Sequence, residues 1–300
     1  MEERGTGKAN QTLAYTMAFI AVAMWSSAFP ASRYSLEHFS PASLMLLRFL
    51  YASATLAAIS AIKGVRLPEK RDLPKFAAGG LVGVFLYMLF FNMGAVTVMS
   101  GVASFIIASA PVFTIIMARL LLKEIVRPIC WVGVAVSFGG LVVVMLSQTA
   151  ELAFGSGAVL ILGSALASGG HNVIQRSLLK RYTALEATTY SVLAGTVFML
   201  AFVPGLVREL PAAPLHVNLV VAYLGIFPAA LGYLSWGLAL SKAEKTTHVT
   251  VFLYLKPFMA SLLGFLWLRE TFSLWSLLGG AIIIAGMVLT NIFGRSRSSK

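Results

Sequence analysis

Two stretches of the chain align without a gap: FIIASAPVFTIIMARLLLKE (Phe105–Glu124) and VFLYLKPFMASLLGFLWLRE (Val251–Glu270). Each has a proline at its seventh residue, a long apolar run after it and a basic–acidic pair at its end. The second also carries Lys256 directly before its proline. A repeated apolar segment with a charge in its middle predicts a duplicated membrane protein with a special site in its second half.

The composition supports this interpretation. The chain has 300 residues, of which 58% are hydrophobic and 11% charged, whereas about a quarter of the residues in soluble domains are charged. The formal net charge of +12 does not indicate a nucleic-acid partner, because Lys and Arg lie in short clusters between apolar runs. The single cysteine, Cys130, excludes an internal disulfide and is interpreted as a small core residue.

About twenty apolar residues suffice to cross a bilayer of about 30 Å. Lipid offers no partner for backbone polar groups, and the runs do not alternate as barrel strands do, so each is predicted to be helical. The fold class is therefore an all-α membrane protein with ten transmembrane helices. They are predicted near 12–32, 41–62, 73–95, 99–122, 128–147, 156–178, 185–204, 217–240, 247–268 and 273–293.

The distribution of Lys and Arg predicts the orientation. The first apolar run is too long for a signal peptide and lacks a small-residue cleavage site, so it is expected to remain as the first span. Of the 23 Lys and Arg residues, eighteen lie on the side of the two termini, and only Arg33, Arg208 and Arg269 lie on the other. This bias predicts that both termini are cytoplasmic. Arg48 and Lys256 lie inside spans.

The repeat extends beyond the opening stretches. A shift of 143 residues aligns Arg33 with Arg176. Two copies of five helices each must enter the membrane in opposite orientations, which is typical of alternating-access transporters; a duplication without a transport role is the alternative. The predicted parts are a tail at 1–11, a first five-helix repeat at 12–147, a linker at 148–155, a second repeat at 156–293 and a tail at 294–300. A shift of 146 residues matches Tyr87 with Tyr233, Pro111 with Pro257, Gly133 with Gly279 and Gly140 with Gly286.

Four motifs carry a resemblance to a known family: MWSSAFPASRYSL (Met24–Leu36), PASLMLLRF (Pro41–Phe49) and the paired AP…LLLKE and KP…LWLRE segments. In this order and spacing the chain resembles the EamA-type family of the drug/metabolite transporter superfamily, and most of all its bacterial amino-acid exporters of the YddG type. The resemblance implies an inner-membrane carrier of ten helices with a central cavity walled by both halves. Many members carry glutamate where this chain has Lys256, so a carboxylate-based coupling mechanism does not carry over.

Prolines inside the spans are candidates for bends that take part in gating. A proline removes one helical hydrogen bond, so Pro111 would free the carbonyl of Ile107, and Pro257 that of Leu253. Such carbonyls are tolerated in the membrane where they line a cavity or meet protein partners. Pro30 in the first span is a third candidate. A static kink that only shapes packing is the alternative for each.

Lys256 is the strongest candidate for contact with a substrate. An unpaired cation at mid-membrane costs about 2.5–3.5 kcal/mol, so it should face a cavity or a partner. All eleven acidic residues lie in loops or at span ends. The expected partner is a substrate carboxylate; the alternative is a neutral, hydrogen-bonded lysine. His171 is the better histidine for proton coupling than His248, although a lone buried histidine is more often structural, and facilitated or weakly coupled export is expected.

Aromatic residues in the first, third, eighth and ninth spans, with a few amides, could form an apolar pocket with polar fixtures. Arg48 is interpreted as a structural residue that reaches the surface or caps loop carbonyls, with a second cavity cation as the alternative. The candidate substrate-binding residues are Lys256, His171, Trp25, Tyr87, Phe91, Asn92, Tyr233, Trp236 and Tyr254.

The predicted function is export of amino acids, including aromatic ones, and related small metabolites across a bacterial inner membrane by a monomer. The alternative is transport or exchange of organic anions such as sugar phosphates or nucleotide sugars, which would call for several cations in the cavity. Enzyme activity is not expected, because GxSxG, HExxH and Walker A sequences are missing. No catalytic residue, metal site or cofactor is predicted.

Overall fold

The computed structural model describes residues 2–121, 128–146, 156–242, 251–271 and 273–293. Within these ranges all regular structure is helical. Seven helices are long and apolar enough to cross a membrane: Asn10–Ser35, Pro41–Lys63, Lys70–Ala95, Ser100–Leu121, Ser156–Gln175, Ala184–Glu209 and Leu215–Ala239. Three shorter apolar helices, Pro128–Val144, Leu255–Leu268 and Leu274–Leu289, occupy the positions of the fifth, ninth and tenth predicted spans.

The elements follow the predicted spans closely but divide several of them. Up to residue 146 they are α1 (Glu2–Ser35), α2 (Pro41–Lys63), η1 (Lys70–Asp72), α3 (Leu73–Gly80), η2 (Leu81–Leu86), α4 (Tyr87–Ala95), α5 (Ser100–Ile107), α6 (Ala110–Leu121) and α7 (Pro128–Leu146). From residue 156 they are α9 (Ser156–Leu178), α10 (Ala184–Met199), η3 (Leu200–Phe202), α11 (Val203–Glu209), α12 (Leu215–Ile226), η4 (Phe227–Leu231), α13 (Gly232–Lys242), η5 (Val251–Tyr254), α15 (Leu255–Leu268) and α16 (Leu274–Phe293).

Local sequence explains where several helices begin and end. Ser40 caps α2, its side chain accepting a hydrogen bond from the Ser43 backbone, and Pro41 fits the first helical position. Gly64 ends α2 with a φ of 63°, which only glycine adopts readily. Thr183 and Glu186 form a reciprocal capping box at the start of α10. At the N-terminus, α1 begins at Glu2, so the segment predicted as an N-terminal tail is helical from that residue on.

Five of the predicted spans are interrupted; the seventh contains the 3-10 segment η3, and the ninth contains the 3-10 segment η5 before α15. The third and eighth spans each contain a π-helical segment, η2 and η4, between two α-helices. Pro228 lies in η4 and offers no backbone N–H, which favours the irregularity there. In the fourth predicted span, α5 ends at Ile107 and α6 begins at Ala110, directly before Pro111. Helices interrupted in this way place unpaired backbone groups inside the protein, where ligands can reach them.

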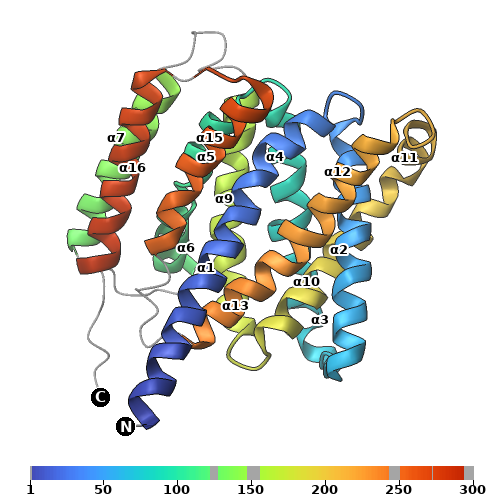
Figure 1. Cartoon of the computed structure of the whole chain (residues 1–300), viewed down its shortest axis with the longest axis horizontal. Coiled ribbons are helices and arrows are strands. Elements are labelled where there is room, and N and C mark those ends of the chain that lie inside the picture. Colours follow the sequence, from blue (N-terminus) through green and yellow to red (C-terminus); the bar gives the residue numbers. More distant parts are fainter. Residues whose placement is uncertain (1, 122–127, 147–155, 243–250, 272, 294–300) are drawn as a thin grey trace.

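α7 and α16 lie side by side at one edge of the molecule, on the left in Figure 1. Their backbones touch at two glycine pairs, Gly140 with Gly279 and Gly133 with Gly286. Because the residue numbers rise along one helix as they fall along the other, the helices are antiparallel. A side chain at Gly140 would meet the Gly279 carbonyl, so small residues are needed for this close approach.

Each of the other main packing contacts joins an element before residue 147 to one after residue 155, and these contacts come in matched sets. α1 packs against α13 and α15, while α9 packs against α4 and α6. α2 packs against α12, while α10 packs against α3, and α2 and α10 also touch each other. The second half of the chain is therefore interleaved with the first, and α2, α10 and α12 gather at the edge opposite α7 and α16 (Figure 1).

The exposed surface of the bundle carries large apolar side chains, such as Leu215, Leu266 and Trp275, which are 75%, 66% and 64% exposed. The interior, in contrast, holds small hydroxyl residues that bond between helices. Ser53 of α2 bonds to Thr196 of α10 at 2.8 Å. An apolar exterior around a hydrogen-bonded interior is the arrangement expected of helices in lipid.

Candidate functional site

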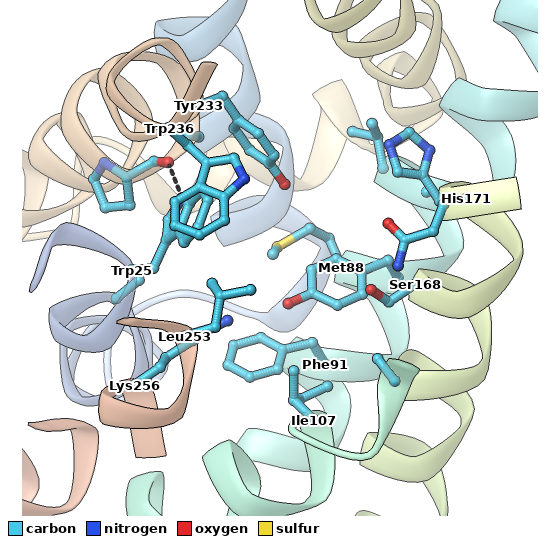
Figure 2. Close-up of a pocket in the computed structure, with 18 of the residues that line it drawn as sticks. Trp25, Met88, Phe91, Ile107, Ser168, His171, Tyr233, Trp236, Leu253 and Lys256 are labelled. Atoms are coloured by element: carbon cyan, nitrogen blue, oxygen red, sulfur yellow. Dashed lines mark hydrogen bonds between the residues drawn. The ribbon is translucent and has the colours of Figure 1, made fainter. Parts of the chain in front are cut away.

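A cavity of about 410 Å³ lies in the middle of the bundle, and elements from both halves of the chain line it. The first half contributes residues of α1, α2, η2, α4, α5 and α6, and the second half residues of α9, α10, η4, α13, η5, α15 and α16. This volume lies in the range of small-molecule sites. Figure 2 shows side chains that line the cavity, with His171 and Ser168 on one side and Trp25, Tyr233 and Trp236 on the other.

The aromatic side of the cavity is organised around Trp25 of α1. Its ring lies 5.4 Å from that of Tyr233 and 5.5 Å from that of Trp236, both in α13. Its Nε1 donates a 3.0 Å hydrogen bond to the carbonyl of Pro228 in η4, drawn as a dashed line in Figure 2. The three predicted aromatic residues are thus brought together, and a backbone contact fixes the orientation of the central one.

Lys256 lines the same cavity from α15, and its amine points toward the cavity interior (Figure 2). Its Nζ lies 5.3 Å from the ring centre of Phe29 and 5.8 Å from that of Trp25, within the range of a cation–π attraction. Ser26 donates a 3.2 Å hydrogen bond to the Lys256 carbonyl, which fixes the start of α15 against α1. None of the described carboxylates lies in the cavity lining or within ion-pair distance of Lys256.

Arg48 of α2 also lines the cavity, and here the structure differs from the favoured interpretation of the sequence. Its side chain does not reach the outer surface, because the residue is only 5% exposed. Its Nη1 donates a 3.4 Å hydrogen bond to Ser32, and its Nε has no hydrogen-bond partner among the described residues. The signal that identified Lys256, an intramembrane cation without an acidic partner, applied equally to Arg48.

Tyr87 and Tyr233 line the cavity at matched positions. Tyr87 is the first residue after the π-helical segment η2, and Tyr233 is the second residue after η4. Phe91 continues the wall from α4, its ring stacked on that of Tyr87 at 6.3 Å and edge-on to that of Phe29 at 5.5 Å. The π-helical segments were not predicted, and the sequence holds no specific signal for them beyond Pro228.

The opposite wall is formed by α9, where Ser168, His171 and Asn172 share one helical face. Asn172 donates a 3.1 Å hydrogen bond to Thr114 of α6. His171 packs so closely against Gly83 of η2 that a side chain at residue 83 would occupy the position of its ring. His171 therefore lines the cavity and is held against a glycine.

The two predicted bend prolines, Pro111 and Pro257, both line the cavity, together with the residues whose carbonyls they leave without a helical donor, Ile107 and Leu253. The Pro257 carbonyl itself accepts a 3.4 Å hydrogen bond from Ser104. Pro30, in contrast, is not among the lining residues, and α1 continues through it to Ser35.

One further sequence candidate, Asn92, is not among the residues that line this cavity. Asn92 is fully buried, and its Nδ2 donates a 3.1 Å hydrogen bond to the carbonyl of Pro41 at the start of α2. The side chain of Tyr254 lies outside the described residues. No group of three His, Cys, Asp or Glu side chains in the described ranges is arranged to hold a metal ion.

Comparison with known proteins identifies the family. The sequence model of the "EamA-like transporter family" matches the chain twice, at residues 12–146 and 155–292. A protein of Streptantibioticus cattleyicolor named "Probable terminal-alkyne amino-acid exporter" is 37% identical over 93% of this chain and 94% of its own length. "Uncharacterized transporter YdfC" of Bacillus subtilis is 31% identical over 90% of this chain and 88% of its own.

More distant similarities agree with this result. "Uncharacterized inner membrane transporter YedA" of Escherichia coli K12 is 28% identical over 91% of this chain and 89% of its own. A solved crystal structure with 20% identity covers 94% of this chain and 99% of its own chain with a TM-score of 0.66, which shows a shared fold. The chain therefore belongs to the EamA-like transporter family, whose members are multi-pass membrane transporters and not enzymes.

Proposed function

We propose that this protein exports amino acids, including aromatic ones, and related small metabolites across a bacterial inner membrane. The observation that carries the proposal is the central cavity, which both halves of the chain line and which contains Lys256 without an acidic partner among the described residues. An α-carboxylate would pair with this ammonium, and the rings of Trp25 and Trp236 would cover an apolar side chain. The relative named as an amino-acid exporter supports the same substrate class.

The proposed mechanism is alternating access between two inverted five-helix repeats, with ten spans and both termini in the cytoplasm. The two matches of the family support this division of the chain. The antiparallel glycine contacts between α7 and α16 support the inversion, because exchanging each glycine for its partner 146 residues away converts one contact into the other. The two π-helical segments also begin 146 residues apart, at Leu81 and Phe227.

Transport is proposed to be facilitated or only weakly coupled to protons, by a monomer. Proton exchange in a membrane carrier usually needs a buried carboxylate or histidine that substrate can displace. The cavity lining contains no carboxylate among the described residues, and His171 is its one described histidine. Pro111 and Pro257, which line the cavity beside carbonyls without helical donors, are the proposed bend points, and Pro30 inside α1 is a third candidate bend.

Transport of organic anions such as sugar phosphates is the second candidate function. One specific observation favours it: Arg48 gives the cavity a second buried cation beside Lys256. Phosphate groups are commonly held by more than one cationic side chain.

Counterflow into proteoliposomes separates the two candidates. Vesicles loaded with unlabelled phenylalanine should accumulate labelled phenylalanine without any ion gradient, while vesicles loaded with a sugar phosphate should not exchange it. Strict exchange of the phosphorylated compound, with no movement of amino acids, would overturn the proposal in favour of the anion exchanger.

A further inference from the structure

The cavity holds two cationic side chains from different helices and different halves of the chain, Arg48 of α2 and Lys256 of α15. The Lys256 ammonium approaches only ring faces among the contacts described above. Arg48 is 5% exposed, and its guanidinium has one long hydrogen bond to Ser32 and an unpartnered Nε. Guanidinium has five N–H donors, so most of its hydrogen-bonding capacity has no partner among the described residues.

The two cations line the same cavity of about 410 Å³, and so do the tyrosines Tyr87 and Tyr233. Two like charges in an apolar enclosure repel each other and lack hydration, so an anion placed between them removes both penalties. A phenol can donate its O–H to the same anion.

The remainder of the cavity gives no counterpart for a second, positively charged group. An α-ammonium is attached to the carbon next to the carboxylate, so it would have to lie near the two cations as well. The described lining residues include no carboxylate that could accept it, and only neutral oxygens, such as those of Ile107 and Leu253, are available. In a zwitterionic amino acid, the two cations therefore attract the carboxylate but repel the ammonium, which offsets part of the binding free energy.

The aromatic wall of the cavity is poorly suited to a sugar. Trp25, Phe29, Phe91 and Trp236 line it mainly with aromatic carbon rather than hydrogen-bonding groups. Sugar hydroxyls buried against these rings would be left without partners, which is costly, whereas an aromatic or aliphatic group would be well covered.

We infer that Arg48 and Lys256 form one anion-binding site, and that the cavity binds apolar carboxylates without a free α-amino group, such as aryl-alkanoates and N-acyl amino acids, more tightly than amino acids. Within the proposed function, on which it rests, this inference names the carboxylate as the required group and Arg48 as a second residue that holds it.

Three compounds with the same phenyl group test the inference: 3-phenylpropionate, phenylalanine and phenethylamine, whose net charges are negative, zero and positive. Binding to the purified full-length protein is measured by quenching of tryptophan fluorescence, since Trp25 and Trp236 line the cavity, and by calorimetry. We expect 3-phenylpropionate to bind about tenfold more tightly than phenylalanine, and phenethylamine to show no binding at concentrations that saturate the acid. Equal or tighter binding of phenylalanine would overturn the inference.

Variants test the role of Arg48 separately. Arg48→Gln should weaken binding of 3-phenylpropionate about tenfold or more, and Arg48→Lys should restore part of the loss because it keeps the charge. Arg208→Gln, an exposed arginine of α11, is the matched control and should bind as the unaltered protein does. Unchanged affinity in a folded Arg48→Gln protein would contradict the shared anion site; if that variant does not fold, the comparison of the three compounds on the unaltered protein still decides.

The inference and the proposed function fail in different ways. If phenylalanine exchanges in counterflow but the acid does not bind more tightly, the inference is wrong and the proposed function stands. If the acid binds and exchanges while no amino acid does, the amino-acid assignment is wrong and the anion site stands.

Discussion

Glu270, just beyond the end of α15, accepts three hydrogen bonds from Ser100 at the start of α5, two from its backbone N–H at 2.9 and 3.1 Å and one from its hydroxyl at 3.0 Å. Arg33, near the end of α1, lies with its Nε 3.4 Å from the same carboxylate. Glu270 is 7% exposed. This cluster joins three helices at the end of the bundle opposite the start of α1 (Figure 1).

Glu270→Gln should lower the free energy of unfolding by about 1.5–3 kcal/mol, because hydrogen bonds to a charged acceptor are replaced by weaker ones. The amide also cannot accept at both atoms, so the Ser100 backbone N–H would keep only one of its two acceptor oxygens. The measurement is thermal unfolding of the purified protein. Glu37→Gln, at an exposed position, is the control. A melting temperature equal to that of the control would mean that the cluster contributes nothing to stability.

Alternating access adds a second readout for Glu270→Gln. If this end of the bundle opens during transport, weakening the cluster should increase labelling of a cysteine placed at Val102, which is buried in α5 and does not line the cavity. The background is a Cys130→Ser protein, since Cys130 is the one native cysteine. Labelling that stays at the level of the Glu37→Gln protein would argue against opening at this end.

Gly83→Ala should displace His171, because the added methyl group would occupy the position of the imidazole. We expect the substrate affinity to fall and the free energy of unfolding to decrease by about 1–3 kcal/mol, the usual cost of overpacking. Binding and thermal unfolding are measured together. Gly205→Ala serves as the control, since its methyl group would meet Ser43 only at an ordinary van der Waals distance. Normal binding by Gly83→Ala would show that the position of His171 does not matter for substrate.

Gly140→Ala should destabilise the contact between α7 and α16. Its methyl group would lie 2.6 Å from the Gly279 carbonyl and from the Ile283 nitrogen, which are backbone atoms that can move only with the helix. The neighbouring Gly139 offers a closely matched control, because a methyl group there meets no atom within 4 Å. In thermal unfolding, we expect the free energy of unfolding to fall by about 1–3 kcal/mol for Gly140→Ala and not to fall for Gly139→Ala. Equal stability of the two variants would contradict the close packing.

Trp25→Phe removes the hydrogen bond from Nε1 to the Pro228 carbonyl and keeps an aromatic ring. The free energy of unfolding should fall by about 1 kcal/mol. Substrate binding should also weaken, because the ring is no longer fixed beside Tyr233 and because phenyl attracts the Lys256 ammonium less than indole does. Trp275→Phe, at a 64% exposed position, should change neither property. Substrate affinity and thermal unfolding distinguish the two variants.

Much of the helical architecture could be predicted from the sequence, because lipid permits no other secondary structure for long apolar runs. The sixth predicted span, 156–178, coincides with α9, and the second, 41–62, differs from α2 by one residue. The break before Pro111 was also predictable, since a proline lacks the required donor. The segments η2 and η4 were not, because a π-helical insertion depends on neighbouring helices rather than on local residue preference.

The site was predictable only where a residue type is costly in the membrane. Lys256 stood out for that reason, and the same cost should have placed Arg48 in the cavity as well. Asn92 was an equally reasonable candidate, but its amide donates to the Pro41 carbonyl instead. Which face of a helix turns inward depends on packing between distant segments, and one sequence without its partners in space does not specify it.

Counterflow of labelled phenylalanine into proteoliposomes, with the unaltered protein, Lys256→Ala and Lys242→Ala, tests the central claim most directly. Lys242, an exposed residue at the end of α13, is the control. The account predicts uptake without any gradient for the unaltered protein and the control, with little change when a pH gradient is imposed. Uptake should fall about tenfold or more for Lys256→Ala. Full uptake by a folded Lys256→Ala protein would contradict the role of the cavity lysine in holding the substrate.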